Sequence, residues 1–140
     1  MKVLFVCVHN AGRSQMAEAL FNRAAQSQGI ASHAMSAGTL GGGRINPVVA
    51  QAMAEIAVPL DGQTPKALTP EMVSWAERIV SMGCGVNAEA CPTKFLVAED
   101  WGLDDPAGQS LEVVRRIRDE VAARVDELVA RLRNQPDNAE

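Results

Sequence analysis

The octapeptide at residues 7–14, Cys-Val-His-Asn-Ala-Gly-Arg-Ser, constrains the fold of this chain more than any other segment. The run that precedes it, residues 3–6, is short and apolar, which is typical of a buried strand. Residues 15–21, which follow it, have the pattern of the first turns of a helix. The octapeptide is therefore predicted to be a strand-to-helix turn whose backbone N–H groups lie at a helix N-terminus. Such a turn carries partial positive charge and unpaired donors, so it binds anions.

The residue types in this turn indicate nucleophilic chemistry on an oxyanion. A helix N-terminus and a nearby cation favour the thiolate of a cysteine, so we expect Cys7 to be ionised at neutral pH. The planar guanidinium of Arg13 can hold two oxygens of a tetrahedral anion, and Ser14 can donate to the Cys7 sulfur. Gly12 permits a tight turn, and Asn10 can pin the turn to backbone. The alternative is an inert buried cysteine beside a surface arginine. The predicted anion-binding residues are Val8, His9, Asn10, Ala11, Gly12, Arg13 and Ser14.

The motif and its position near the N-terminus resemble the low-molecular-weight tyrosine phosphatase superfamily, and within it the thioredoxin-coupled arsenate reductases. The resemblance extends from Met1 to about Arg133, and the motif alone fits both branches. It implies an α/β fold with a four-stranded parallel sheet in the order 2-1-3-4, flanked by helices on both faces. The anion loop would then lie at the C-terminal end of the first strand, where such sheets bind ligands.

Two further cysteines, Cys84 and Cys91, separate these branches, and with Cys7 they make up all 3 cysteines of the chain. We expect no metal, because there is no C-x-x-C pair and only His9 and His33 could assist. The odd number of cysteines and the short N-terminal apolar run argue against a secreted disulfide framework. In a cytosolic protein, cysteines that accompany a reactive thiolate more often form transient, catalytic disulfides. Packing as small hydrophobes is the alternative.

The spacing of Cys84 and Cys91 restricts how they can pair. On a continuous helix they would lie ~10.5 Å apart along the axis, whereas a disulfide needs Cα atoms roughly 4.4–6.8 Å apart. Gly83, Gly85 and Pro92 make the segment a poor helix, which is consistent with a segment that can unwind.

The resemblance implies that these cysteines act as a thiol relay. Cys7 would form a covalent thiol–arsenate adduct, and Cys84 would attack Cys7 as arsenite leaves. Cys91 would then attack Cys84, which regenerates Cys7. An external dithiol protein such as thioredoxin would reduce the last disulfide by exchange, without any bound cofactor.

Residues 101–108 contain a third candidate. The superfamily carries an Asp-Pro pair in this region with the aspartate as general acid, and Asp105 with Pro106 matches it. A carboxyl above the anion loop can protonate a leaving oxygen or take the thiol proton; an ordinary turn is the alternative. Related phosphatases follow this pair with aromatic residues, whereas this chain continues with Ala107 and contains no tyrosine. This departure favours arsenate over phosphotyrosine. Trp101 could wall the site or belong to the core.

Composition limits the partners. A chain of 140 residues with 47% hydrophobic and 21% charged residues is typical of a soluble domain, which we predict over residues 1–133 with a frayed tail at 134–140. No apolar stretch is long enough to cross a membrane. The net charge of -4 and the lack of a basic stripe argue against nucleic acid. We expect a cytoplasmic monomer that binds arsenate, and also phosphate or sulfate-like oxyanions.

Strands and helices are predicted to alternate along the chain, which favours a parallel sheet covered on both faces. Strands are expected at residues 3–7, 32–37, 78–82 and 94–98. Helices are expected at 13–28, after Asn46 with Pro47 at the first position, from Thr69 to about Ala76, and after Ser110. The predicted apolar face of the last helix consists of Leu111, Val114, Ile117, Val121, Val125, Leu128 and Leu132.

Three functions follow from these patterns. Arsenate reduction by the relay comes first. The alternative is a phosphomonoester hydrolase, for which Cys7, Arg13 and Asp105 suffice, and a non-catalytic oxyanion-binding domain is the third. Glu18 and Ser36 could contribute to a monovalent-cation site, as in some related reductases, or be a loop anchor and a strand end.

Overall fold

A parallel four-stranded sheet in the order β2-β1-β3-β4 forms the centre of the protein, as predicted. The computed structural model describes residues 1–82 and 99–134. The strands are β1 (Lys2–Cys7), β2 (His33–Gly38), β3 (Arg78–Ser81) and β4 (Glu99–Asp100). The predicted strand at residues 94–98 lies outside the described residues, as do Cys84 and Cys91. The register sets Cys7 opposite Gly38 and Val6 opposite Ser81, so these strand ends share one edge.

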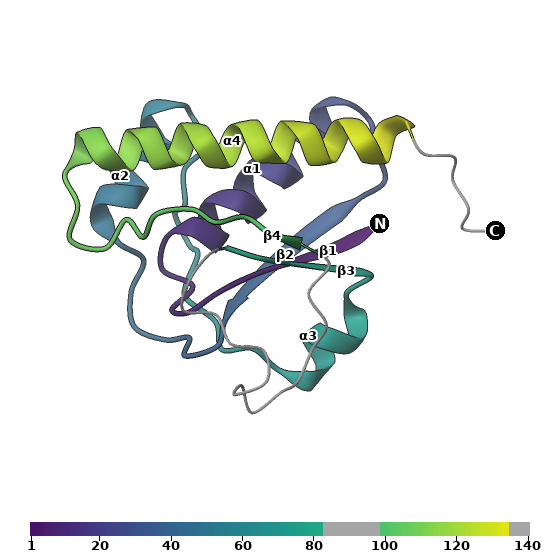
Figure 1. Ribbon diagram of the computed structural model, residues 1–140, viewed down its shortest axis with the longest axis horizontal. Coiled ribbons are helices and arrows are strands. Elements are labelled where there is room, and N and C mark those ends of the chain that lie inside the picture. The colour runs from purple at the N-terminus through teal and green to yellow at the C-terminus, as the bar shows by residue number, and fades with distance from the viewer. Residues whose placement is uncertain (83–98, 135–140) are drawn as a thin grey trace.

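Helices cover both faces of the sheet (Figure 1). Helices α1 (Arg13–Ser27), α2 (Pro47–Glu55) and α4 (Leu111–Asn134) lie on one face, and the short α3 (Pro70–Trp75) lies on the other. Alternation along β1 explains this division, because successive side chains of a strand point to opposite faces. Val3, Phe5 and Cys7 join the larger core, whereas Leu4 and Val6 pack on the α3 side. The Cys7 side chain therefore points to the face of the sheet that α1 covers.

Local signals set the helix starts as predicted. Asn46 Oδ1 accepts from Val48 N at 2.9 Å at the start of α2, and Thr69 Oγ1 accepts from Met72 N at 3.2 Å at the start of α3. Ser110 Oγ accepts from Val113 N at 3.3 Å and caps α4. These polar caps satisfy N–H groups that have no partner within the helix.

Trp101 lies in the hydrophobic core. It is 2% exposed, and the centroid of its ring lies 5.3 Å from that of Phe5. The alternative that Trp101 belongs to the core is therefore correct. The predicted face of α4 is largely confirmed, although Leu111 and Leu132 are only partly buried. The buried residues of α4 are Val114, Ile117, Arg118, Val121, Val125, Leu128 and Val129.

Arg118 is the unexpected member of this buried face. Its Nη1 donates to the Ala52 carbonyl oxygen at 2.9 Å and lies 3.1 Å from Glu55 Oε1, so its charge is paired at the end of α2. None of the described helices is both long and apolar enough to span a membrane.

Candidate active site

The anion loop, residues 8–14, joins the end of β1 to the start of α1, as the sequence predicts. Backbone N–H groups from other segments bind two carbonyl oxygens of the loop. Val8 O accepts from Leu40 N at 2.7 Å, and Ala11 O accepts from Asn46 N at 2.9 Å. These bonds turn the negative ends of the peptides outward, as an anion-binding concavity requires. Gly38 allows the close approach, because a Cβ atom there would lie 2.6 Å from Val8 O.

Within the loop, the left-handed backbone conformation lies at Asn10, whereas the φ of Gly12 is negative. Asn10 has a φ of 58°, in the left-handed region that asparagine tolerates better than most residues. Gly12 has a φ of -145° and is needed for another reason: a Cβ atom there would lie 2.8 Å from Pro106 Cγ. Gly12 therefore admits the Asp-Pro segment against the anion loop.

Cys7 is a free, buried thiol with two polar neighbours at its sulfur. Asn10 N donates to Cys7 Sγ at 3.1 Å, and Ser14 Oγ lies 2.7 Å from the same atom. The prediction that Ser14 reaches the Cys7 sulfur agrees with this geometry.

A second layer of buried polar groups supports these contacts. Asn10 Nδ2 donates to Ser14 Oγ at 2.7 Å, while Asn10 Oδ1 accepts from Gln15 Nε2 at 2.9 Å and from Lys66 N at 2.8 Å. The bond from Lys66 N is the predicted pinning of Asn10 to backbone. Gln15 is missed by sequence reasoning, because a glutamine in the first turn of a helix carries no local sign of burial.

Arg13 is also buried, and it both lines the pocket and donates hydrogen bonds to backbone carbonyl groups. Its Nη1 donates to the carbonyl oxygens of Met82 and Leu103, both at 2.9 Å. Met82 directly follows β3, and Leu103 precedes the Asp-Pro pair, so one side chain joins the two segments. Met82 also stands two positions before Cys84 in the sequence.

Asp105 lies beside this guanidinium, with Oδ2 4.0 Å from Arg13 Nη2. Its Oδ1 accepts from Ala107 N at 3.0 Å, which is the turn geometry typical of aspartate. The side chain is 58% exposed, so the carboxyl can exchange protons with solvent. Both predicted interpretations of Asp105, a turn former and a carboxyl at the site, describe real features of its position.

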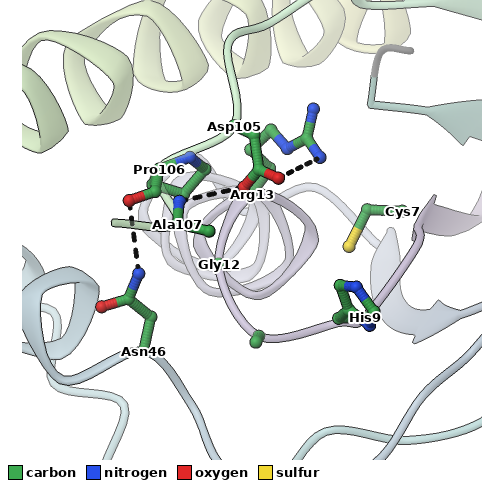
Figure 2. A pocket seen from close by; sticks show the side chains of 9 residues that line it. Cys7, His9, Gly12, Arg13, Asn46, Asp105, Pro106 and Ala107 are labelled. Carbon is green, nitrogen blue, oxygen red and sulfur yellow. Dashed lines mark hydrogen bonds and ion pairs between the residues drawn. The ribbon is translucent and has the colours of Figure 1, made fainter. Parts of the chain in front are cut away.

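One pocket unites these side chains (Figure 2). In this view the His9 ring lies next to Cys7. The lining residues are Cys7, His9, Ala11, Gly12, Arg13, Asn46, Asp105, Pro106 and Ala107. Sequence reasoning named Asn46 only as a helix cap, and no local signal marked it as part of the pocket.

Glu18 on α1 and Ser36 on β2 lie together. Ser36 Oγ donates to Glu18 Oε1 at 2.5 Å, and Lys66 Nζ lies 3.6 Å from the same oxygen. The side-chain ammonium of Lys66 therefore lies beside the Glu18 carboxylate. Within residues 1–82 and 99–134, no three His, Cys, Asp or Glu side chains gather as metal ligands.

A cysteine at the end of the first strand, held above a helix N-terminus on a 2-1-3-4 sheet, defines a phosphatase-like class of protein. The match to a family model over residues 2–138 then shows that this chain belongs to the low molecular weight phosphotyrosine protein phosphatase family. The resemblance stated from the sequence is therefore confirmed.

Relatives of both branches are similar to this chain. A glutaredoxin arsenate reductase from Synechocystis is 36% identical over 132 residues, which cover 94% of this chain and 98% of the relative. The structure of an arsenate reductase in a phosphate-binding state has a TM-score of 0.77 and 34% identity, with 94% and 98% of the two chains covered. A low molecular weight protein tyrosine phosphatase from T. tengcongensis has a TM-score of 0.83 and 26% identity, with 94% and 99% covered.

Proposed function

We propose that this protein reduces arsenate to arsenite, with Cys7 as the nucleophile. The observation that carries this proposal is the pattern of identity within the family. The chain is 32–36% identical to relatives described as arsenate reductases but 26% identical to the tyrosine phosphatase, over similar coverage. The two kinds of relative share the fold, so the identity rather than the architecture favours reduction.

The first step uses the residues that line the pocket. Arsenate binds in the anion loop beside Arg13, whose guanidinium offsets the charge of the anion. The Cys7 thiolate attacks arsenic and forms an S–As bond, and one arsenate oxygen leaves as water after it receives a proton. Asp105 supplies that proton from its exposed position at the same pocket.

The redox step belongs to Cys84 and Cys91, which we assign from the sequence and the family resemblance. The Cys84 thiolate attacks Cys7 Sγ, the S–As bond breaks, and its electron pair stays on arsenic, which leaves as arsenite. Arsenic gains two electrons, and the two thiols lose them by forming a Cys7–Cys84 disulfide. Cys91 then attacks Cys84, which frees the Cys7 thiolate and leaves a Cys84–Cys91 disulfide. Met82, just before this segment, contacts Arg13, which supports the delivery of Cys84 to the site.

An external dithiol closes the cycle, and we propose thioredoxin in the cytoplasm, where thiols are kept reduced. The name of the Synechocystis relative introduces glutaredoxin as the competing reductant. Either reductant would reduce the same Cys84–Cys91 disulfide.

Phosphomonoester hydrolysis is the second candidate, because Cys7, Arg13 and Asp105 line one pocket and suffice for it. Hydrolysis would use the same adduct chemistry on phosphorus, with water in place of Cys84. Cys84 and Cys91 would then have no catalytic part.

The two functions are separated by one paired assay. Arsenate-dependent NADPH consumption is measured with thioredoxin and its reductase, and in parallel with glutaredoxin, glutathione and glutathione reductase. Hydrolysis of an aryl phosphate is measured on the same sample. Repeated turnover of arsenate with little hydrolysis is expected. Efficient hydrolysis without NADPH loss in either reducing system would overturn the proposal.

A further inference from the structure

We infer that Gln15 is a positioning residue that, together with the Lys66 N–H, holds the hydrogen bonds reaching Cys7 in one direction, and thereby favours the Cys7 thiolate. This inference deepens the proposed function and rests on Cys7 being the nucleophile. It does not depend on whether arsenate or a phosphomonoester is attacked.

Two backbone groups of fixed character determine the orientation of the side-chain amides. The Thr64 carbonyl oxygen can only accept, and it lies 3.1 Å from Gln15 Nε2, so the nitrogen of the Gln15 amide faces this segment. The Lys66 N–H can only donate, and it lies 2.8 Å from Asn10 Oδ1. The Gln15 nitrogen also donates to Asn10 Oδ1, at 2.9 Å.

The orientation of Asn10 then determines that of Ser14. Because Asn10 Oδ1 receives two donors, its Nδ2 faces Ser14 Oγ, at 2.7 Å. Ser14 Oγ therefore accepts from Asn10, and its hydroxyl hydrogen is available for Cys7 Sγ, also at 2.7 Å. The bonds run in one direction, from Gln15 through Asn10 and Ser14 to the sulfur.

Burial makes this direction persistent. Gln15 is 1% exposed, and Asn10 and Ser14 are fully buried, so water does not compete for these groups. Each donor in such a chain polarises the next, and a buried donor without a partner is costly. With the Asn10 N–H at 3.1 Å, the sulfur has two donors, which stabilise its negative charge.

The test uses Gln15→Met, which keeps the length of the side chain but removes the donor. The Cys7-containing peptide of the full-length protein is quantified by mass spectrometry after timed iodoacetamide labelling between pH 4 and pH 9. The pH of half-maximal labelling is expected to rise, because Asn10 Oδ1 loses one of its two donors and the chain of hydrogen bonds to the sulfur is weakened. Gln15→Glu, which has nearly the same shape but opposes Asn10 Oδ1 with an acceptor, is expected to produce a larger rise.

Matched controls separate direction from packing. Gln26 lies exposed on the same helix, so Gln26→Met and Gln26→Glu are expected to leave the labelling profile unchanged. In a Ser14→Ala background, Gln15→Met is expected to add no further shift, because the pathway to the sulfur is already interrupted.

An unchanged profile in both Gln15 variants would overturn the inference, as would a full additional shift in the Ser14→Ala background. If Gln15→Met fails to fold by circular dichroism, Gln15→Glu carries the same test. The labelling assay contains no arsenate. A failure of arsenate reduction with the expected shift present therefore contradicts the proposed function alone, and the reverse result contradicts only the role of Gln15.

Discussion

Asn46 Nδ2 donates to the carbonyl oxygen of Pro106 at 3.4 Å, and thereby joins the start of α2 to the segment that carries Asp105. The backbone N–H of Asn46 donates to Ala11 in the anion loop at 2.9 Å. One residue thus links the anion loop to the segment that carries Asp105.

Asn46→Ser is expected to lower kcat by up to roughly tenfold with little change in Tm. Serine still caps α2 but is too short to reach Pro106, and one neutral hydrogen bond contributes about 0.5–1.5 kcal/mol. Steady-state kinetics and thermal denaturation check this. Thr69→Ser, which changes the cap of α3 away from the pocket, is the control; equal rates in the two variants would contradict the role of Asn46.

Asp105→Asn is expected to lower kcat by roughly 10²–10⁴-fold, the usual contribution of a general acid. Sulfate should bind as tightly or more tightly, because a negative charge 4.0 Å from Arg13 is removed. Calorimetric titration with sulfate and the kinetic assay measure the two effects. The neighbouring Asp104→Asn, whose exposed carboxylate pairs with Arg116, is expected to affect neither.

Gly12→Ala is expected to destabilise the protein by about 1–3 kcal/mol, the usual cost of overpacking. The added Cβ would meet the buried Pro106 ring at 2.8 Å, which also displaces Asp105 and lowers kcat. Chemical denaturation and kinetics test both effects. Gly102→Ala adds a Cβ into open space and should match the parent protein; a similar loss there would show that the contact with Pro106 is irrelevant.

Cys91→Ser is expected to release one equivalent of arsenite per protein and then stop as a Cys7–Cys84 disulfide. Cys84→Ser is expected to stop earlier, because no thiol attacks the adduct on Cys7. Rapid-quench analysis of arsenite and mass spectrometry of the disulfides measure these end points. Sustained turnover by either variant with thioredoxin would refute the relay.

Glu55 lies at the junction of α2 and α4, where it makes the stability of the fold depend on pH. Its hydrogen bond with Arg115, at 2.6 Å, is the main cause that lowers the pKa of the Glu55 carboxyl below its usual value of 4.5, and Arg118 adds to it. A lowered pKa in the folded state stabilises the fold above the unfolded pKa, and the contribution disappears as pH falls through the folded pKa. Glu55→Gln should therefore lower Tm at pH 7, and the difference should shrink as pH falls below 4.5. Asp126→Asn on α4 is the exposed control, and a Tm difference for Glu55→Gln that does not shrink as pH falls would contradict the assignment.

The parts of this structure that sequence reasoning found are those with local causes. The strand, turn and helix around Cys7 follow from adjacent residues, as do the caps at Asn46 and Thr69, because a cap acts within three positions. The order of the strands came from the family resemblance rather than from the residues, since strand pairing joins segments far apart in the chain.

The sequence by itself determined the chemistry available to this protein: a thiol, a guanidinium and a carboxyl near an anion-binding turn. Only the tertiary structure decided how they are held. Arg13 reaches the carbonyls of Met82 and Leu103, and Gln15 reaches Thr64, across separations that no local pattern encodes. The physical reason is burial, because a polar group enclosed by distant segments must take its partners from whichever backbone atoms the packing brings near.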